Sequence, residues 1–240
     1  DNYTLSLTEY QAAYFAHELS RRYSLSDSEK LAPALADAQV DLNPHQLDAA
    51  LFAFQSPLSK GCILADEVGL GKTIEAGLVI AQKWSERKRR ILIITPANLR
   101  KQWSMEMAEK FYLPSTILEA KNFRQLQKDG RKNPWVQDTL VICSYQFAAK
   151  NSDKILALPW DLAVIDEAHR LRNVYKSDNK IAKAIKAALC NTQKLLLTAT
   201  PLQNSLMELY GLVSVIDEYA FGDEKSYKAQ YARLTSETTF

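Results

Sequence analysis

The residues with the clearest chemical potential follow a short apolar run and form the sequence Gly69-Leu-Gly-Lys-Thr73. Two glycines allow backbone N–H groups to curl around phosphate oxygens, and a helix that starts beside them adds its dipole. In such a loop Lys72 would contact the β- and γ-phosphates of a nucleoside triphosphate, and the Thr73 hydroxyl would bind Mg²⁺. The expected phosphate-binding residues are Glu67, Val68, Gly69, Leu70, Gly71, Lys72 and Thr73.

Two adjacent acids, Asp166 and Glu167, close an apolar stretch that begins at Asp161. From a strand end, Asp166 can face Mg²⁺ through a water molecule, and Glu167 can polarise the water that attacks the γ-phosphate. The alternative for Asp166 and Glu167 is an acidic strand end before a solvated helix. The alternative for the Gly-Lys-Thr triplet is a strand–turn–helix that binds no ligand. The two stretches, about ninety residues apart, favour phosphoryl transfer together. The predicted catalytic residues are Lys72, Asp166 and Glu167, and the predicted metal ligands are Thr73 and Asp166.

Hydroxyl side chains close a third apolar stretch, which reads Leu195-Leu-Leu-Thr-Ala-Thr-Pro201. Thr198 and Thr200 can hydrogen-bond to the acids and so report the state of the nucleotide to another surface. His169, three residues after Asp166, is predicted to link the two stretches. A threonine-rich strand end with ordinary turn chemistry is the alternative.

Six runs, most of them near-continuous apolar stretches with β-branched residues, predict the strands that would position these side chains. Near-continuous runs of this kind are typical of a parallel sheet with helices on both faces, which is an α/β fold. In such a fold ligands bind at the carboxyl ends of the strands. The expected strands are 62–65, 90–95, 115–118, 139–144, 162–166 and 194–198, and the expected helices between and after them are 73–84, 98–111, 123–127, 180–189 and 205–216.

Helical patterns also precede and follow this region. Aromatic and apolar residues at helical spacing predict three helices before the first strand and one near the end of the chain. We therefore expect a helical extension over 1–40, a nucleotide-binding lobe over 41–220 and a connector over 221–240. The expected flanking helices are 8–23, 26–38, 45–54 and 221–234.

Composition limits the function classes. Of the 240 residues 47% are hydrophobic, enough for a substantial core, while a formal net charge of +2 gives no argument for nucleic acid. Any such surface must come from local clusters, of which 87–90 and 121–132 are the densest. We interpret 87–90 as a solvated helix-to-strand turn and leave 121–132 open. No apolar run approaches the ~20 residues of a membrane span, so no membrane partner is expected.

The three cysteines, Cys62, Cys143 and Cys190, form no C-x-x-C pair. Cys62 and Cys143 lie in strand-like runs, where small buried thiols are the expected interpretation. This usage favours a reduced, cytoplasmic compartment. No signal peptide is visible, although Asp1 is not an initiator methionine and leaves a removed signal open.

Three stretches resemble the Swi/Snf-type ATPases of helicase superfamily II, in particular bacterial members with a DEAH box. They are Ala65-Asp-Glu-Val-Gly-Leu-Gly-Lys-Thr73, Asp166-Glu-Ala-His169 and Leu197-Thr-Ala-Thr-Pro-Leu-Gln-Asn204. The general phosphate-loop pattern has glycine at the position of Asp66, whereas aspartate is usual in this family. Pro44-His-Gln46 is similar to the family motif whose glutamine reads adenine, although the arginine often found before that proline is Asn43 here.

Two further blocks, 91–103 and 140–145, resemble family segments on the nucleic-acid side of the lobe. The resemblance implies a RecA-like fold, ATP and Mg²⁺ as cofactors, and movement along double-stranded DNA on the nucleoid. It also implies a second RecA-like lobe in cis and, for some bacterial members, RNA polymerase or a defence or repair complex as partner. The implied DNA contacts are Arg100, Lys101, Gln102, Ser144 and Tyr145.

Only the first lobe's motifs are present, and the arginine fingers belong to the second lobe. Loss of an arginine finger costs on the order of 10³–10⁵ in turnover, so we expect this chain alone to bind ATP·Mg²⁺ weakly and hydrolyse it very slowly. A strand-separating or RNA-directed helicase shares the same motifs and remains an alternative. A non-catalytic binding module remains another for the isolated chain.

Overall fold

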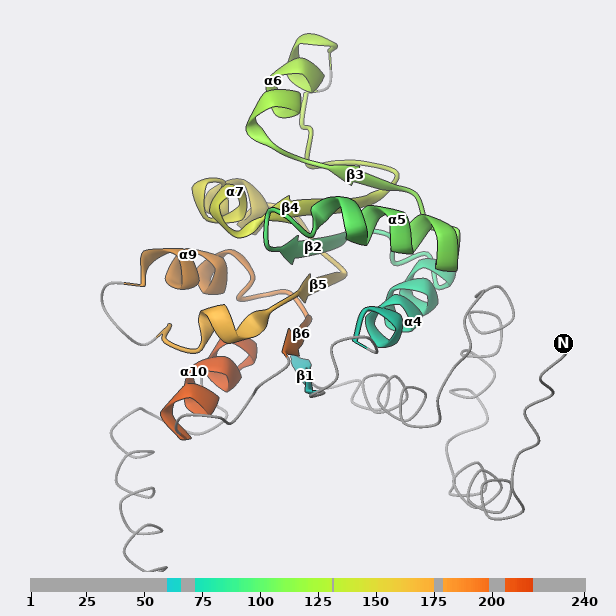
Figure 1. The fold of residues 1–240 in the computed structure, drawn as a ribbon. Coiled ribbons are helices and arrows are strands. Elements are labelled where there is room, and N and C mark those ends of the chain that lie inside the picture. Colours follow the sequence, from blue (N-terminus) through green and yellow to red (C-terminus); the bar gives the residue numbers. More distant parts are fainter. Residues whose placement is uncertain (1–59, 66–71, 131, 175–178, 199–205, 218–240) are drawn as a thin grey trace, which may run out of the picture.

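The structure, a computed structural model, describes residues 60–65, 72–130, 132–174, 179–198 and 206–217 (Figure 1). The expected flanking helices, Gln46, most of the phosphate loop (66–71) and Thr200 lie outside these residues. The domain boundaries at 40 and 220 therefore stay predictions.

Six parallel strands form one sheet in the order β1-β6-β5-β2-β4-β3. The strands are β1 (Gly61–Ala65), β2 (Ile91–Thr95), β3 (Ser115–Ile117), β4 (Leu140–Ser144), β5 (Leu162–Ile165) and β6 (Lys194–Thr198). The α/β fold and all six expected strands are confirmed. Every residue of β2, β4, β5 and β6 is buried, which explains why each strand reads as a continuous run rather than an alternating one.

Helices cover both faces of the sheet (Figure 1). They are α4 (Lys72–Ser85), α5 (Arg100–Phe111), α6 (Ala120–Lys128), α7 (Tyr145–Lys150), α8 (Ser152–Leu156), the 3₁₀ turn η1 (Ala168–Leu171), α9 (Lys180–Ala188) and α10 (Leu206–Ile216). Helices α4 and α5 pack on one face, while α7, α8, α9 and α10 pack on the other. None of the described helices is both long and apolar enough to cross a bilayer.

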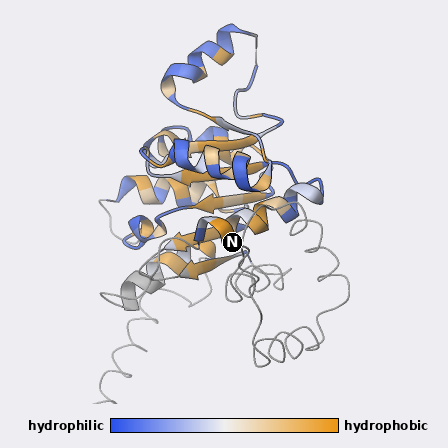
Figure 2. Ribbon diagram, turned by 45° about the vertical axis from the view of Figure 1, so that its right-hand side comes forward, coloured by the Kyte–Doolittle hydropathy of each residue, from blue (hydrophilic) through white to orange (hydrophobic). Residues whose placement is uncertain are grey.

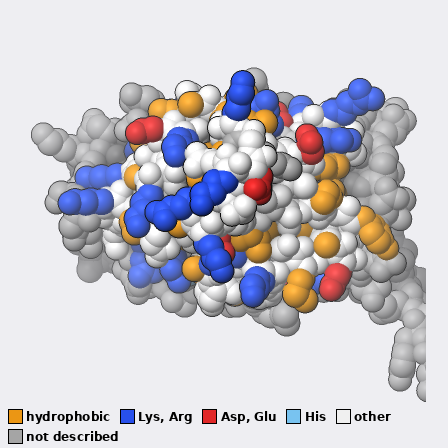
Figure 3. Space-filling view, turned by 90° about the horizontal axis from the view of Figure 1, so that it is seen from above, with side chains coloured by type: hydrophobic (Ala, Val, Ile, Leu, Met, Phe, Trp, Pro, Cys, Tyr) orange, Lys and Arg blue, Asp and Glu red, His pale blue; other side chains and the backbone are white. Residues whose placement is uncertain are grey.

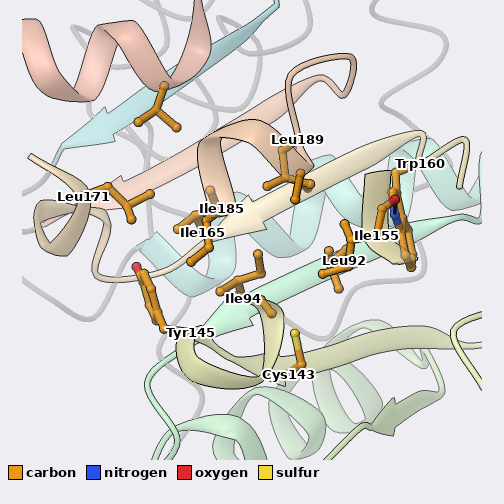
Figure 4. Packing of buried hydrophobic residues seen from close by; sticks show 14 of the residues in the cluster. Leu92, Ile94, Cys143, Tyr145, Ile155, Trp160, Ile165, Leu171, Ile185 and Leu189 are labelled. Atoms are coloured by element: carbon orange, nitrogen blue, oxygen red, sulfur yellow. Dashed lines mark hydrogen bonds between the residues drawn. The ribbon is translucent and has the colours of Figure 1, made fainter. Parts of the chain in front are cut away.

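Strand β2 shows how the two cores are built. Successive side chains of a strand point to opposite faces. Ile91 and Ile93 join the cluster under α4 and α5, whereas Leu92 and Ile94 join the cluster on the other face (Figure 4). Figure 2 shows the result: the sheet is hydrophobic throughout, and the hydrophilic residues lie on the outer sides of the helices.

Three short elements differ from the sequence-based expectation, which had no helix at α7, α8 or η1. Helix α7 begins at Tyr145, directly after β4, and the Ser144 hydroxyl caps it by accepting a 3.1 Å hydrogen bond from the Phe147 amide. No glycine or proline separates strand from helix there, so the local pattern gives no signal of the change. Helix α6 also starts three residues before the expected Phe123.

Gly77 allows α4 and α5 to approach closely. A Cβ at this position would overlap the Phe111 ring of α5. Since α4 begins with Lys72 and α5 carries Trp103, this contact fixes the relative position of two elements that reach the candidate site.

Candidate functional site

Several residues that the sequence predicts for chemistry follow strands that end at the carboxyl edge of the sheet. Strand β6 lies between β1 and β5, and its last residue Thr198 pairs with Ala65 of β1. Neighbouring strands lie about 4.8 Å apart, so β1 and β5 are about 10 Å apart. Chain segments that leave β1 and β5 at this edge therefore start close enough for one ligand to contact both.

Lys72 is the first residue of α4, which follows β1 after residues 66–71. Lys72 is only 5% exposed and has an interaction within the chain. Thr73 beside it is half-buried. The N-terminal turn of α4 adds the positive end of the helix dipole, which favours an anion.

Asp166 leaves the end of β5 and is held by three donors. Its Oδ2 accepts hydrogen bonds from Thr95 Oγ1 at 3.0 Å and from Trp103 Nε1 at 2.8 Å. Its Oδ1 accepts a 2.9 Å bond from the Glu167 amide. The side chain is buried, so these donors replace the water that a carboxylate would otherwise bind.

Glu167 adopts left-handed backbone angles, φ 52° and ψ 44°. For a residue other than glycine this region costs about 1–2 kcal/mol and needs support from its surroundings. Tyr145 gives that support: its hydroxyl donates to the Asp166 carbonyl at 2.6 Å and to the Glu167 carbonyl at 3.2 Å. Burial, and next the charge of Asp166, raise the pKa of Tyr145, so the hydroxyl remains a donor at neutral pH.

The predicted link from His169 to the threonines is only partly within the described residues. His169 Nδ1 lies 3.2 Å from Glu167 Oε2, a contact that is an ion pair when the imidazole is protonated. Thr198 is fully buried at the end of β6 and interacts within the chain. The role of His169 and Thr198 in coupling stays a prediction.

The five predicted DNA contacts fall into two groups. Lys101 and Gln102 are exposed on the first turn of α5, and Gln102 donates to Glu106 on the same helix. Arg100 is bound to Glu119 at 3.0 Å. Ser144 and Tyr145 are 7% and 3% exposed and hydrogen-bonded within the chain. Contact with DNA stays a prediction for all five, and exposure makes Lys101 and Gln102 the stronger candidates.

Basic residues are exposed in both runs that the sequence singled out. Residues 87–90 form the connection between α4 and β2, which confirms the expected helix-to-strand turn. The run 121–132 includes Lys121, Arg124 and Lys128 on the outer side of α6. Figure 3 shows Lys and Arg side chains gathered on this face of the molecule.

A small cavity of about 20 Å³ lies among residues at the opposite, amino edge of the sheet, between Arg90, Trp135 and Trp160. This volume suits about one water molecule. The Trp135 indole N–H is buried and has no hydrogen-bond partner among the described residues, so a single water would satisfy it. The cavity is separate from the site at the carboxyl edge.

Sequence reasoning did not assign Thr95 or Trp103 to the site, or Tyr145 to the support of the acids. Each reaches Asp166 or Glu167 from a strand end or helix that lies 21 to 71 positions away in the chain. The available signal was the polar end of each apolar run: Thr95 closes β2, which neighbours β5. When two parallel strands are neighbours, the polar residues at their carboxyl ends lie close together, as Thr95 and Asp166 do here.

Comparison with known proteins identifies the family to which this arrangement belongs. The SNF2-related domain matches residues 11–239 of the chain. The chain belongs to the SNF2-related family. Within that family, the "Uncharacterized ATP-dependent helicase YqhH" of Bacillus subtilis is 32% identical over 222 residues, which are 91% of this chain and 37% of that protein.

A second relative is "RNA polymerase-associated protein RapA" of Pectobacterium atrosepticum, 36% identical over 201 residues, which are 82% of this chain and 21% of RapA. The chain thus spans between about a fifth and two fifths of these relatives. Among solved structures, the Sulfolobus solfataricus SWI2/SNF2 ATPase core in complex with dsDNA superposes with a TM-score of 0.68 at 23% identity. The match covers 80% of this chain and 39% of that one, and it confirms the expected RecA-like α/β fold.

Proposed function

We propose that this SNF2-family chain is the ATP-binding lobe of an ATP-dependent translocase on double-stranded DNA. The observation that carries the proposal is the order of the elements: Lys72 and Thr73 begin α4 after β1, and Asp166 and Glu167 follow β5, which is separated from β1 by β6 alone. A second RecA-like lobe would complete the site. In this proposal the protein acts in the cytoplasm on the nucleoid.

The residues present fit a magnesium–triphosphate. A carboxylate has about four acceptor positions, and the donors described above fill three of those on Asp166. One position on Oδ1 has no partner among the described residues. Together with the Thr73 hydroxyl it makes an all-oxygen donor pair, which suits Mg²⁺. When bound, the ion would neutralise charge on the phosphates.

Each side chain then has one task. Lys72 holds the β- and γ-phosphates, and the first turn of α4 adds backbone donors. Glu167, one third exposed at 34%, can accept a hydrogen bond from the attacking water and orient it. The left-handed backbone at Glu167 turns its side chain away from the path that a continuing strand would give it.

Double-stranded DNA is the proposed track. Lys101 and Gln102 on α5 would hold phosphates, contacts that position a motor without reading sequence. The structural neighbour described with dsDNA supports this choice, and the RapA relatives support RNA polymerase as one candidate partner beside a repair or defence complex. Two further residues belong to the proposed site: Gln46 would recognise adenine, and Thr200 would help to couple the nucleotide state to another surface.

The test is steady-state ATP hydrolysis with duplex DNA, single-stranded DNA or RNA. We expect the full-length protein to be stimulated most by duplex DNA and the 240-residue chain to turn over at least 10³-fold more slowly. Glu167→Gln should abolish the stimulated rate, whereas Glu109→Gln, on the exposed side of α5, should not. Equal stimulation by RNA would favour the helicase alternative, and no hydrolysis with any nucleic acid would favour a binding module.

A further inference from the structure

Two side chains from outside the acidic stretch hold one oxygen of Asp166. The Trp103 indole N–H comes from α5 at 2.8 Å, and the Thr95 hydroxyl comes from the end of β2 at 3.0 Å. Trp103 is 2% exposed and Thr95 is fully buried. Both bonds are therefore shielded from water, which strengthens them.

These two donors decide which carboxylate oxygen is available to a ligand. Both act on Oδ2, while Oδ1 receives only the Glu167 amide among the described residues. Since a carboxylate can rotate about its last torsion, loss of either donor would let the two oxygens exchange places. Both donors act on the same oxygen from fixed positions in the fold, so they set the orientation of the Asp166 carboxylate.

Trp103 connects this carboxylate to the surface of α5. The indole packs among buried side chains of α4, α5 and the sheet, including Met107 of its own helix. Lys101 and Gln102 precede it directly and are exposed. A helix moves as a rigid body, so a ligand that displaces the exposed turn also displaces the indole N–H relative to β5.

We propose that Trp103 is a positioning residue for Asp166, through which α5 transmits binding of a polyanion to the metal-binding carboxylate. Thr95 is the fixed second donor, because it belongs to the strand that pairs with β5. The inference rests on the proposed function, in which Asp166 faces the magnesium–nucleotide. It adds a residue that touches neither nucleotide nor DNA.

The first test compares Trp103→Phe with Trp84→Phe in the full-length protein. Both tryptophans pack in the same cluster, but only Trp103 bonds to Asp166. We expect Trp103→Phe to raise the Mg²⁺ concentration for half-maximal ATP hydrolysis about tenfold and to reduce stimulation by duplex DNA by a similar factor. Trp84→Phe should change neither. Thr95→Val should also raise the Mg²⁺ concentration for half-maximal hydrolysis. Thr95→Ser keeps the hydroxyl and should leave that concentration at the wild-type value.

The second readout does not depend on hydrolysis. In protein labelled with 5-fluorotryptophan, the ¹⁹F resonance of Trp103 is assigned by its loss in Trp103→Phe. It should shift on Asp166→Asn and again on addition of duplex DNA. The inference is overturned if the resonance shifts neither on Asp166→Asn nor on addition of duplex DNA. It is also overturned if Trp103→Phe and Trp84→Phe have the same Mg²⁺ and DNA dependence. In both cases the proposed function stands. If the wild type hydrolyses no ATP with any nucleic acid, the proposed function fails, and the resonance alone then decides about Trp103.

Discussion

The Tyr145 hydroxyl donates a 2.6 Å hydrogen bond to the main-chain carbonyl of Asp166. The same hydroxyl reaches the Glu167 carbonyl at 3.2 Å, so one side chain at the start of α7 holds the backbone of both acids. Figure 4 shows the ring at the border of the hydrophobic cluster that lies between the sheet and α7, α8 and α9. The position of the proposed catalytic carboxylates thus depends on a residue that follows β4, two strands away from β5 in the sheet.

Replacing Tyr145 by Phe tests this support. The ring remains and the two carbonyls lose their donor, so we expect ATP hydrolysis to fall about tenfold with little change in the KM for ATP. The free energy of unfolding should fall by about 1–2 kcal/mol, the usual cost of leaving a buried acceptor unpaired. Tyr112→Phe is the matched control, because Tyr112 is 59% exposed. Unchanged turnover in Tyr145→Phe would show that the bond has no catalytic role.

Glu167→Gly separates the backbone requirement at this position from the chemical one. Glycine adopts left-handed angles without steric cost, whereas in ordinary helical or strand positions it costs about 0.5–1 kcal/mol. We expect Glu167→Gly to leave thermal stability unchanged or higher while stimulated hydrolysis is lost. Ala168→Gly, at the next and fully buried position, should lower the free energy of unfolding by about 1 kcal/mol. Equal destabilisation by both substitutions would contradict the left-handed assignment at Glu167.

The buried amine of Lys194 should make folding stability rise with pH above about pH 8. Its amine is buried and donates to the carbonyls of Leu189 at 2.6 Å and Thr192 at 2.7 Å. Burial lowers the pKa of Lys194 from 10.5 to about 8. Between these two values the unfolded chain holds a proton that the folded chain has released, so folding stability rises with pH in this window. Below pH 8 both states are protonated and the contribution is constant.

The measurement is urea unfolding of the wild type and of Lys194→Met from pH 7 to 10. The difference between the two free energies should grow in favour of the wild type above pH 8, by at most about 3 kcal/mol for 2.5 pKa units. The difference is needed because burial also raises the pKa of Cys143 from 9.0 to about 12, which makes stability fall above pH 9. A pH-independent difference would show that Lys194 titrates normally.

Gly211 lies where α10 packs against Arg172, the residue after η1, and there is no room for a larger side chain. A Cβ at Gly211 would overlap the backbone carbonyl of Arg172, which cannot move as a side chain can. We expect Gly211→Ala to reduce the free energy of unfolding by about 2–3 kcal/mol. Gly130→Ala serves for comparison: its φ is +86° but nothing lies near the added carbon, so its cost should be about 1 kcal/mol. Similar small losses for both would place α10 farther from Arg172.

The strands could be predicted from sequence because most are near-continuous apolar runs, and β2, β4, β5 and β6 are buried throughout. The strand order could not, since β6 enters between β1 and β5 after more than a hundred residues. Local patterns also missed α7, whose strand-to-helix change depends on one hydroxyl cap at Ser144. Tertiary contacts, not propensity, determine both features.

In the candidate site, too, some residues could be predicted from sequence and others could not. Asp166 and Glu167 could be proposed because two acids after an apolar run are unusual and have a known chemical use. The bonds from Thr95 and Trp103 join residues 71 and 63 positions apart, so only the pairing of β2 with β5 and the packing of α5 bring them to Asp166. Gln46, residues 66–71 and Thr200 stay predictions.

Calorimetric titration of the wild type with ATP, with and without Mg²⁺, tests most directly whether one nucleotide contacts both sides of the sheet edge. Thr73→Val and Asp166→Asn should each remove the Mg²⁺-dependent gain in affinity. The double variant should lose no more than either single one, since both residues would serve one ion. Lys72→Ala should weaken binding in both conditions. Additive losses in the double variant, or affinity that none of the three substitutions changes, would contradict a shared magnesium–nucleotide site.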